Sequence, residues 1–114
     1  MKNIESVIDL SSGQPWEQDG DKQLREVFSG ERRQLLEIRL RNMAVLTKHK
    51  AAEPITVLCL DGSGTFYAGA ELEEEQKMTA GTLVTLEADV LHEVAAEPNI
   101  HILVTKFKAD RMIP

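Results

Sequence analysis

The stretch that decides the fold of this chain reads TKHKAAEPITVLCLDGSG from residue 47 to residue 64. An acidic tract follows it, and the chain then reads AGTLVTLEADVLHEV from residue 80 to residue 94. His49 lies just before one segment rich in β-forming residues, and His92 lies just after another. This arrangement predicts a small β-barrel with a pocket at one end, close to the two histidines.

The segment after Pro54 has two apolar faces. Ile55, Val57 and Cys59 lie on one face, and Thr56, Leu58 and Leu60 lie on the other. Because both faces are mostly apolar, each of them must be covered. The interior of a barrel covers one face, and either a further strand layer or a second subunit covers the other. On this ground we expect a homodimer.

Upstream of this segment the sequence predicts a β-hairpin. Its first arm covers residues 22 to 28, and Ser29-Gly30 supplies the turn. In the return strand Leu36, Ile38 and Leu40 alternate with Glu37, Arg39 and Arg41. Alternation of this kind is typical of a half-buried strand whose charged face lies in solvent.

Downstream, further short strands are expected between turns. Asp61-Gly62-Ser63-Gly64 predicts a turn, and strands are expected over residues 83 to 86 and 100 to 107. The acidic tract from Glu71 to Glu75 is interpreted as the solvated end of a hairpin. Short strands at this spacing predict an all-β sandwich or barrel.

Composition narrows the class of protein. The chain has 114 residues, of which 42% are hydrophobic, as expected for one domain with a sizeable core. Its formal net charge of -6 and its 4% of aromatic residues argue against nucleic acid as a partner. Cys59 is the only cysteine, which excludes an internal disulfide and a multi-thiolate metal site. No apolar run reaches membrane-spanning length, so a soluble, cytoplasmic protein is expected.

Two segments, His49 to Gly62 and Gly81 to His92, resemble the two motifs of the cupin superfamily. In that family the pattern G-x5-H-x-H-x3/4-E-x6-G supplies two histidines and a glutamate, and G-x5-P-x-G-x2-H-x3-N supplies a third histidine. His49 takes the first histidine position, and Gly81 and His92 match the second motif. Other residues stand at the remaining motif positions: Met43, Ala51, Ile55, Glu87, Asp89 and Ala96.

The resemblance implies a jelly-roll β-barrel, also called a double-stranded β-helix, with its ligands in the barrel mouth. We place this barrel over residues 20–108, with an N-terminal arm and loop over residues 1–19 and a C-terminal tail over residues 109–114. Trp16 is the only tryptophan, and it is expected to pin that loop either to the barrel or to a second subunit.

A pocket that contains His49 and His92 allows two kinds of chemistry. A divalent ion such as Zn, Fe, Mn or Ni needs three or more protein ligands, for which Glu53 and His101 are the additional candidates. Glu53 shares strand parity with His49, whereas parity leaves the face of His101 open. Without a metal, neutral imidazoles suit recognition of a hydroxyl or carboxylate group. By the same parity, Lys48 is expected to point away from the interior.

Three functions follow from these alternatives. The first is binding of a small molecule in the barrel mouth, as a sensor or accessory module. The second is metal-dependent catalysis by an isomerase, decarboxylase or dioxygenase acting on a small polar substrate. The third is a structural or protein-interaction domain with a vestigial pocket. The fold alone does not choose among them.

Overall fold

The computed structural model describes residues 3–10 and 20–108, and every regular element in these ranges is a β-strand. Trp16, the loop around it and the tail from Ala109 lie outside the described residues. The seven strands are β1 (Lys22–Ser29), β2 (Arg33–Leu40), β3 (Val45–His49), β4 (Ile55–Ala68), β5 (Glu74–Thr79), β6 (Leu83–Leu86) and β7 (His92–Phe107). The predicted hairpin is β1 and β2, and the strand predicted at residues 83 to 86 is β6.

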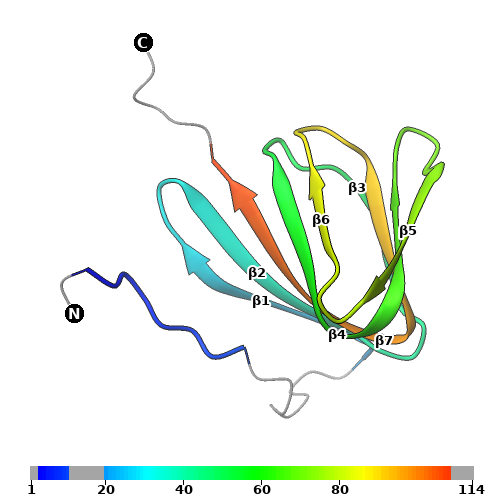
Figure 1. Cartoon of the computed structure of the whole chain (residues 1–114), viewed down its shortest axis with the longest axis horizontal. Helices are drawn as coiled ribbons and strands as arrows, with labels where there is room; N and C mark the ends of the chain where they lie inside the picture. Colours follow the sequence, from blue (N-terminus) through cyan, green and yellow to red (C-terminus); the bar gives the residue numbers. More distant parts are fainter. Residues whose placement is uncertain (1–2, 11–19, 109–114) are drawn as a thin grey trace.

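Two long strands, β4 and β7, build the architecture because each of them belongs to two layers. The first half of β4 pairs with the second half of β7, and the second half of β4 pairs with the first half of β7. Both pairings are antiparallel. One layer has the order β1-β2-β7-β4-β6, and the other has the order β3-β7-β4-β5. Figure 1 shows that the two layers diverge from the bends of β4 and β7, so that the structure is closed at the bends and open at the opposite end. This is a jelly-roll arrangement, as expected.

The turn predicted at Asp61-Gly62-Ser63-Gly64 is wrong, because these residues lie inside β4. Two shifts of register mark β-bulges where the strand bends from one layer to the other. Gly62 has a φ of 80°, and a Cβ atom on it would collide with the carbonyl oxygen of Asn99. A Cβ atom on Gly64 would collide with the carbonyl oxygen of Ala95. The glycines therefore allow β4 to bend against β7 rather than reverse the chain.

The strand expected from Ile100 to Phe107 is only the second half of β7. This strand has 16 residues and begins at His92. Even-numbered residues of both halves, such as Val94 and Ile102, are buried between the layers. Because β7 bends, its first and last residues both lie toward the open end of the barrel (Figure 1).

The core fills the space between the layers from the closed end. Its largest fully buried side chains include Phe66, Leu40, Met78 and Ile102. Cys59 also belongs to this core, and burial raises the pKa of its thiol. A buried thiol with a raised pKa is a poor nucleophile, so Cys59 has a packing role.

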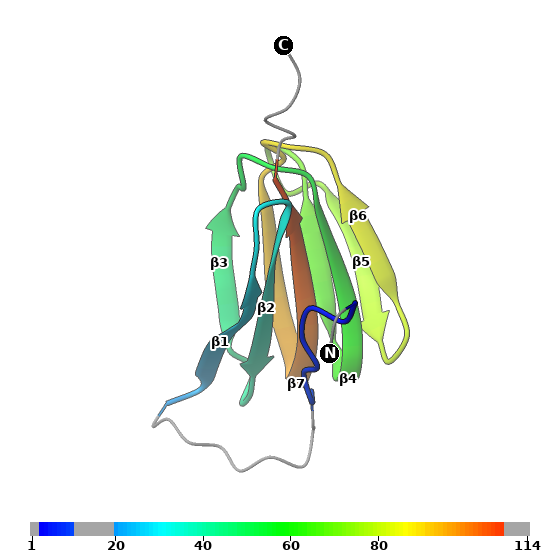
Figure 2. The ribbon, with the colours of Figure 1, turned by 90° about the vertical axis from the view of Figure 1, so that its left-hand side faces the viewer.

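Residues 3–10 contain no strand and run along the outside of the barrel. Figure 2 shows this segment in front of the layer that contains β1, β2 and β7. Arg25 donates a hydrogen bond to the carbonyl oxygen of Asp9 at 3.4 Å, and Arg33 pairs with Glu5 at 3.2 Å. Within the described ranges, the structure contains no helix capable of crossing a membrane.

Candidate functional site

A cavity of about 380 Å³ lies between the two layers. Its lining is mostly apolar and comes from strands of both layers. The lining residues are Leu24, Leu36, Ile38, Leu46, Thr47, Lys48, His49, Ala51, Ile55, Val57, Phe66, His92, Val94, Ile102, Val104 and Lys106. This volume is in the range of small-molecule sites in proteins.

His49 and His92 meet at this cavity. They are direct partners in the pairing of β3 with β7, and their ring centroids lie 4.3 Å apart. The His92 ring also stacks on Phe66, with 5.7 Å between centroids. His92 is buried, with 4% of its surface exposed, whereas His49 is exposed. The exposed His49 ring is thus in contact with the buried His92 ring.

A β-bulge in β3 explains how His49 reaches the cavity. Leu46 pairs with Val94 and His49 pairs with His92, so three steps along β3 match two steps along β7. In a regular strand, residues three apart face opposite sides of the sheet. The extra residue shifts the parity, so both Leu46 and His49 line the cavity.

The hydrogen bonds of the two rings determine which nitrogen is left for a ligand. Nδ1 of His49 lies 2.9 Å from the carbonyl oxygen of Thr47, and Nδ1 of His92 lies 2.9 Å from that of Val90. A carbonyl oxygen only accepts, so each Nδ1–H is the donor and each neutral ring keeps a lone pair on Nε2. Burial lowers the pKa of His92, as do the nearby charges of His49 and Lys106, while the Val90 carbonyl opposes the shift.

Two lysines also line the cavity, and sequence parity did not predict either of them. Lys48 was expected to point away from the interior, but it lines the cavity while remaining exposed. Lys106, which is half-buried, lies near the end of β7 and on its inner face. The bulge in β3 explains why Lys48 lines the cavity. The bend of β7 explains why Lys106 lies close to His92.

The structure does not bring Glu53 or His101 to the histidine pair. Glu53 lies in the connection between β3 and β4, where the chain is not an extended strand, and it does not line the cavity. His101 is an odd-numbered residue of β7 and lies on its outer face. Its Nε2 is 2.8 Å from a carboxylate oxygen of Glu37.

The residues present do not fit a metal centre with three protein ligands. In both histidines Nδ1–H is bound to a carbonyl oxygen and Nε2 is left open, as is usual for histidines that bind a metal. Over residues 3–10 and 20–108, however, no group of three His, Cys, Asp or Glu side chains is placed to hold an ion. The pair therefore provides two nitrogen ligands where a stable site needs three or more.

The side chain of Glu37 was expected to lie in solvent, but the structure buries it. It is on the outer face of β2, but only 5% of its surface is exposed. Arg25 donates to one of its carboxylate oxygens at 2.9 Å, and His101 contacts the other. The charged face of β2 is thus partly covered, and the carboxylate is stabilised by two partners.

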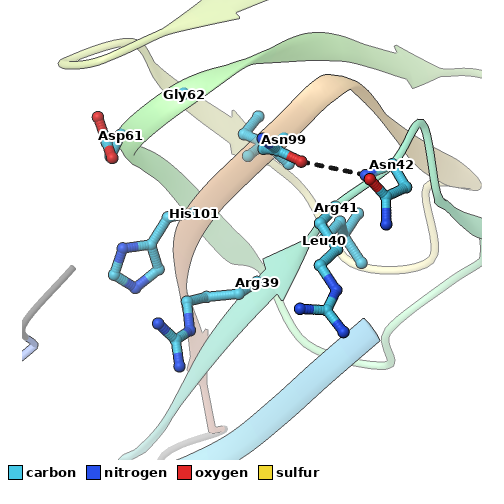
Figure 3. Close-up of a pocket in the computed structure, with 9 residues that line it drawn as sticks. Arg39, Leu40, Arg41, Asn42, Asp61, Gly62, Asn99 and His101 are labelled. Carbon is cyan, nitrogen blue, oxygen red and sulfur yellow. Dashed lines mark hydrogen bonds between the residues drawn. The ribbon is translucent and has the colours of Figure 1, made fainter. Parts of the chain in front are cut away.

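A second cavity of about 390 Å³ lies on this outer face (Figure 3). His101, Arg39 and Arg41 line it together with Asn42, Asp61 and Asn99. Several of these groups already bond to protein: Arg39 to Gln23, Arg41 to the carbonyl of Gly20, and the Asn42 amide to Asn99. Nδ1 of His101 is buried without a hydrogen-bond partner. The interior cavity is the better candidate site, because several polar groups of the outer cavity already bond to protein whereas the interior cavity has a mostly apolar wall with few polar side chains.

Comparisons with known proteins give the same fold. Neither a protein-family model nor a curated protein sequence matches the chain. Among solved structures, a cupin superfamily protein from Desulfitobacterium hafniense is 11% identical, with a TM-score of 0.77 over 93% of this chain and 94% of that chain. An RmlC-like cupin protein from Desulfovibrio desulfuricans is 16% identical, with a TM-score of 0.76 over 88% of this chain and 94% of that chain.

The similar structures also include an enzyme. Oxalate decarboxylase from Bacillus subtilis is 18% identical, with a TM-score of 0.71 over 80% of this chain and 26% of that chain. At these identities the likeness concerns the fold and carries no activity across. Together with the jelly-roll topology, it shows that this chain has the fold of a small cupin protein.

Proposed function

We propose that this chain binds a small molecule in the interior cavity, with His49 and His92 as its polar contacts. The observation that carries the proposal is a cavity of about 380 Å³ whose walls are apolar and whose polar side chains are few. Ligand sites in proteins commonly combine an apolar wall with a small number of placed polar groups. The Nε2 lone pairs of the neutral rings suit a ligand that donates a hydrogen bond.

A cavity-filling variant tests this proposal. Ala51 lines the cavity, whereas its neighbour Ala52 is exposed and does not. Ala51→Trp is expected to abolish binding of compounds that ligand-observed NMR detects with the wild-type protein, and Ala52→Trp is expected to leave binding unchanged. Compounds that bind both variants equally would place the binding site elsewhere, and the absence of any binding compound in a broad screen would contradict the proposal.

A second candidate function is metal-dependent catalysis by an isomerase, decarboxylase or dioxygenase. The specific observation in its favour is that both Nδ1–H groups are held by carbonyl oxygens, as in metal-bound histidines. Elemental analysis of the purified protein tests it, with His92→Ala and His101→Ala as a matched pair. About one ion per chain, lost only in His92→Ala, would support this candidate. Metal well below that level, not restored by added ions, would contradict it.

A further inference from the structure

The mouth of the interior cavity has a charge opposite to that of the whole chain. The formal net charge is -6, yet the cavity is lined by Lys48 and Lys106 next to the two histidines. Among the described residues that line it, none is Asp or Glu. Lys106 is close enough to His92 to lower its pKa. An anion at this position would therefore meet only positive or neutral side chains.

The ammonium groups of the two lysines have no carboxylate partner among the described residues, although the backbone N–H of Lys48 donates to the Glu93 carboxylate at 3.1 Å. Lys77, by comparison, pairs with Glu97 at 3.1 Å. Within the described part of the chain, neither Lys48 nor Lys106 forms an ion pair with a carboxylate. For the half-buried Lys106, an ammonium group without a carboxylate partner is a ready site for a ligand carboxylate.

Deeper in the cavity the lining has almost no hydrogen-bonding capacity. The inner walls consist of apolar side chains from both layers: Leu36, Ile38, Val57, Phe66, Val94, Ile102 and Val104. A sugar or another polyol would leave most of its hydroxyl groups unpaired against these walls, at a cost for each group. A small dianion without an apolar part would leave the walls unfilled. The lining thus favours a ligand with one polar end and one apolar end.

We infer that the ligand of this site is a monoanion with an apolar body, of the class of aliphatic monocarboxylic acids. The carboxylate would lie at the mouth between Lys106 and Lys48, and the aliphatic part would lie against the inner walls. This inference rests on the proposed function, since it names the ligand class of the same cavity. It goes beyond the histidine pair because it assigns the charge recognition to the lysines.

Three probes that differ in one property each test the inference by isothermal titration calorimetry. Hexanoate has both the charge and the apolar body, hexanamide has the body without the charge, and acetate has the charge without most of the body. We expect hexanoate to bind at least about tenfold more tightly than either of the others. Its affinity should fall with added salt, whereas that of hexanamide should not.

Lysine variants identify the groups that recognise the charge. Lys106→Met is expected to weaken hexanoate about tenfold and to leave hexanamide unchanged, and Lys106→Arg should restore most of the hexanoate affinity. Lys50→Met serves as the matched control, because Lys50 is exposed and does not line the cavity. Thermal unfolding of each variant verifies that it is folded.

The possible outcomes separate the two proposals. If hexanamide binds as tightly as hexanoate, or if Lys106→Met leaves hexanoate binding unchanged, the monoanion inference is overturned and small-molecule binding stands. If none of the three probes binds, while other neutral compounds bind and Ala51→Trp blocks their binding, the monoanion inference is overturned and small-molecule binding stands. If no compound of any kind binds, the proposed function and the inference fail together.

Discussion

Among single residues, His92 has a pKa that its buried environment lowers. Its ring is buried between Phe66 and His49, and its Nδ1–H donates to the Val90 carbonyl. Burial is the largest cause of its lowered pKa. The charges of His49 and Lys106 lower the pKa further. The folded state therefore binds a proton at this ring less readily than the unfolded chain does.

The sign of the resulting pH dependence follows from linkage. A group whose pKa is lower in the folded state contributes stability that is present above its unfolded pKa, here about 6.5. This stability is lost as the pH falls through the lower folded value. We expect the free energy of unfolding to decrease between pH 7.5 and pH 5, and to decrease less in His92→Gln. Urea unfolding at several pH values measures both, and parallel curves for the two proteins would contradict the prediction.

The histidine pair also shows how far single residues could be predicted. The motif spacing singled out His49 and His92, and the structure brings these two residues together. The motif spacing did not indicate Lys106, because this residue lies close to His92 only through the bend of β7. Strand parity misplaced Lys48, because the bulge in β3 breaks the alternation next to His49 and leaves both neighbouring residues lining the cavity.

Among the strands, β4 and β7 decide the shape of the barrel. Each bends where it passes from one layer to the other, and the bend of β4 coincides with glycines that approach the backbone of β7. The sequence Asp61-Gly62-Ser63-Gly64 is locally indistinguishable from a turn. The pairing of this segment with β7, and of Ser63 and Gly64 with β5, keeps the strand continuous.

Two glycines with positive φ allow the bend in β4 to be tested. Gly62 has a φ of 80° and no room for a Cβ atom, whereas Gly81 has a φ of 95° and nothing within 4 Å of a Cβ position. Gly81→Ala is expected to reduce the free energy of unfolding by about 1 kcal/mol, the cost of the backbone conformation alone. Gly62→Ala adds a collision with the Asn99 carbonyl and should cost about 3 kcal/mol or more. Equal losses, measured by chemical unfolding, would show that the bend tolerates a side chain.

For the whole molecule, the layer that contains β4 has an apolar row on its outer face. Leu58 of β4 pairs with Leu83 of β6 on one side and with Leu103 of β7 on the other. These three leucines form an apolar row on the outer face, and Leu83 has 58% of its surface exposed. An apolar row of this kind is a candidate subunit interface. The homodimer expected from the sequence stays a prediction.

Sedimentation of matched variants tests this prediction. We expect the wild-type chain to sediment as a dimer at micromolar concentration and Leu83→Glu to shift it to the monomer, because a charge would be buried in the interface. Met43 is similarly exposed but lies in the connection between β2 and β3, so Met43→Glu serves as the control and should remain dimeric. A monomeric wild-type protein would remove the reason for expecting a second subunit on this face.

The sequence by itself determined the all-β class, most of the strands and the two histidines of the cavity. These features depend on local alternation and on the spacing of a few residues, which a single strand already displays. The tertiary structure alone decided that β4 and β7 bend instead of ending, that a bulge turns Lys48 and His49 toward the cavity, and that His101 faces outward to Glu37. The physical reason is that bulges and bends are set by the backbone hydrogen bonds of neighbouring strands, which lie far apart in the sequence.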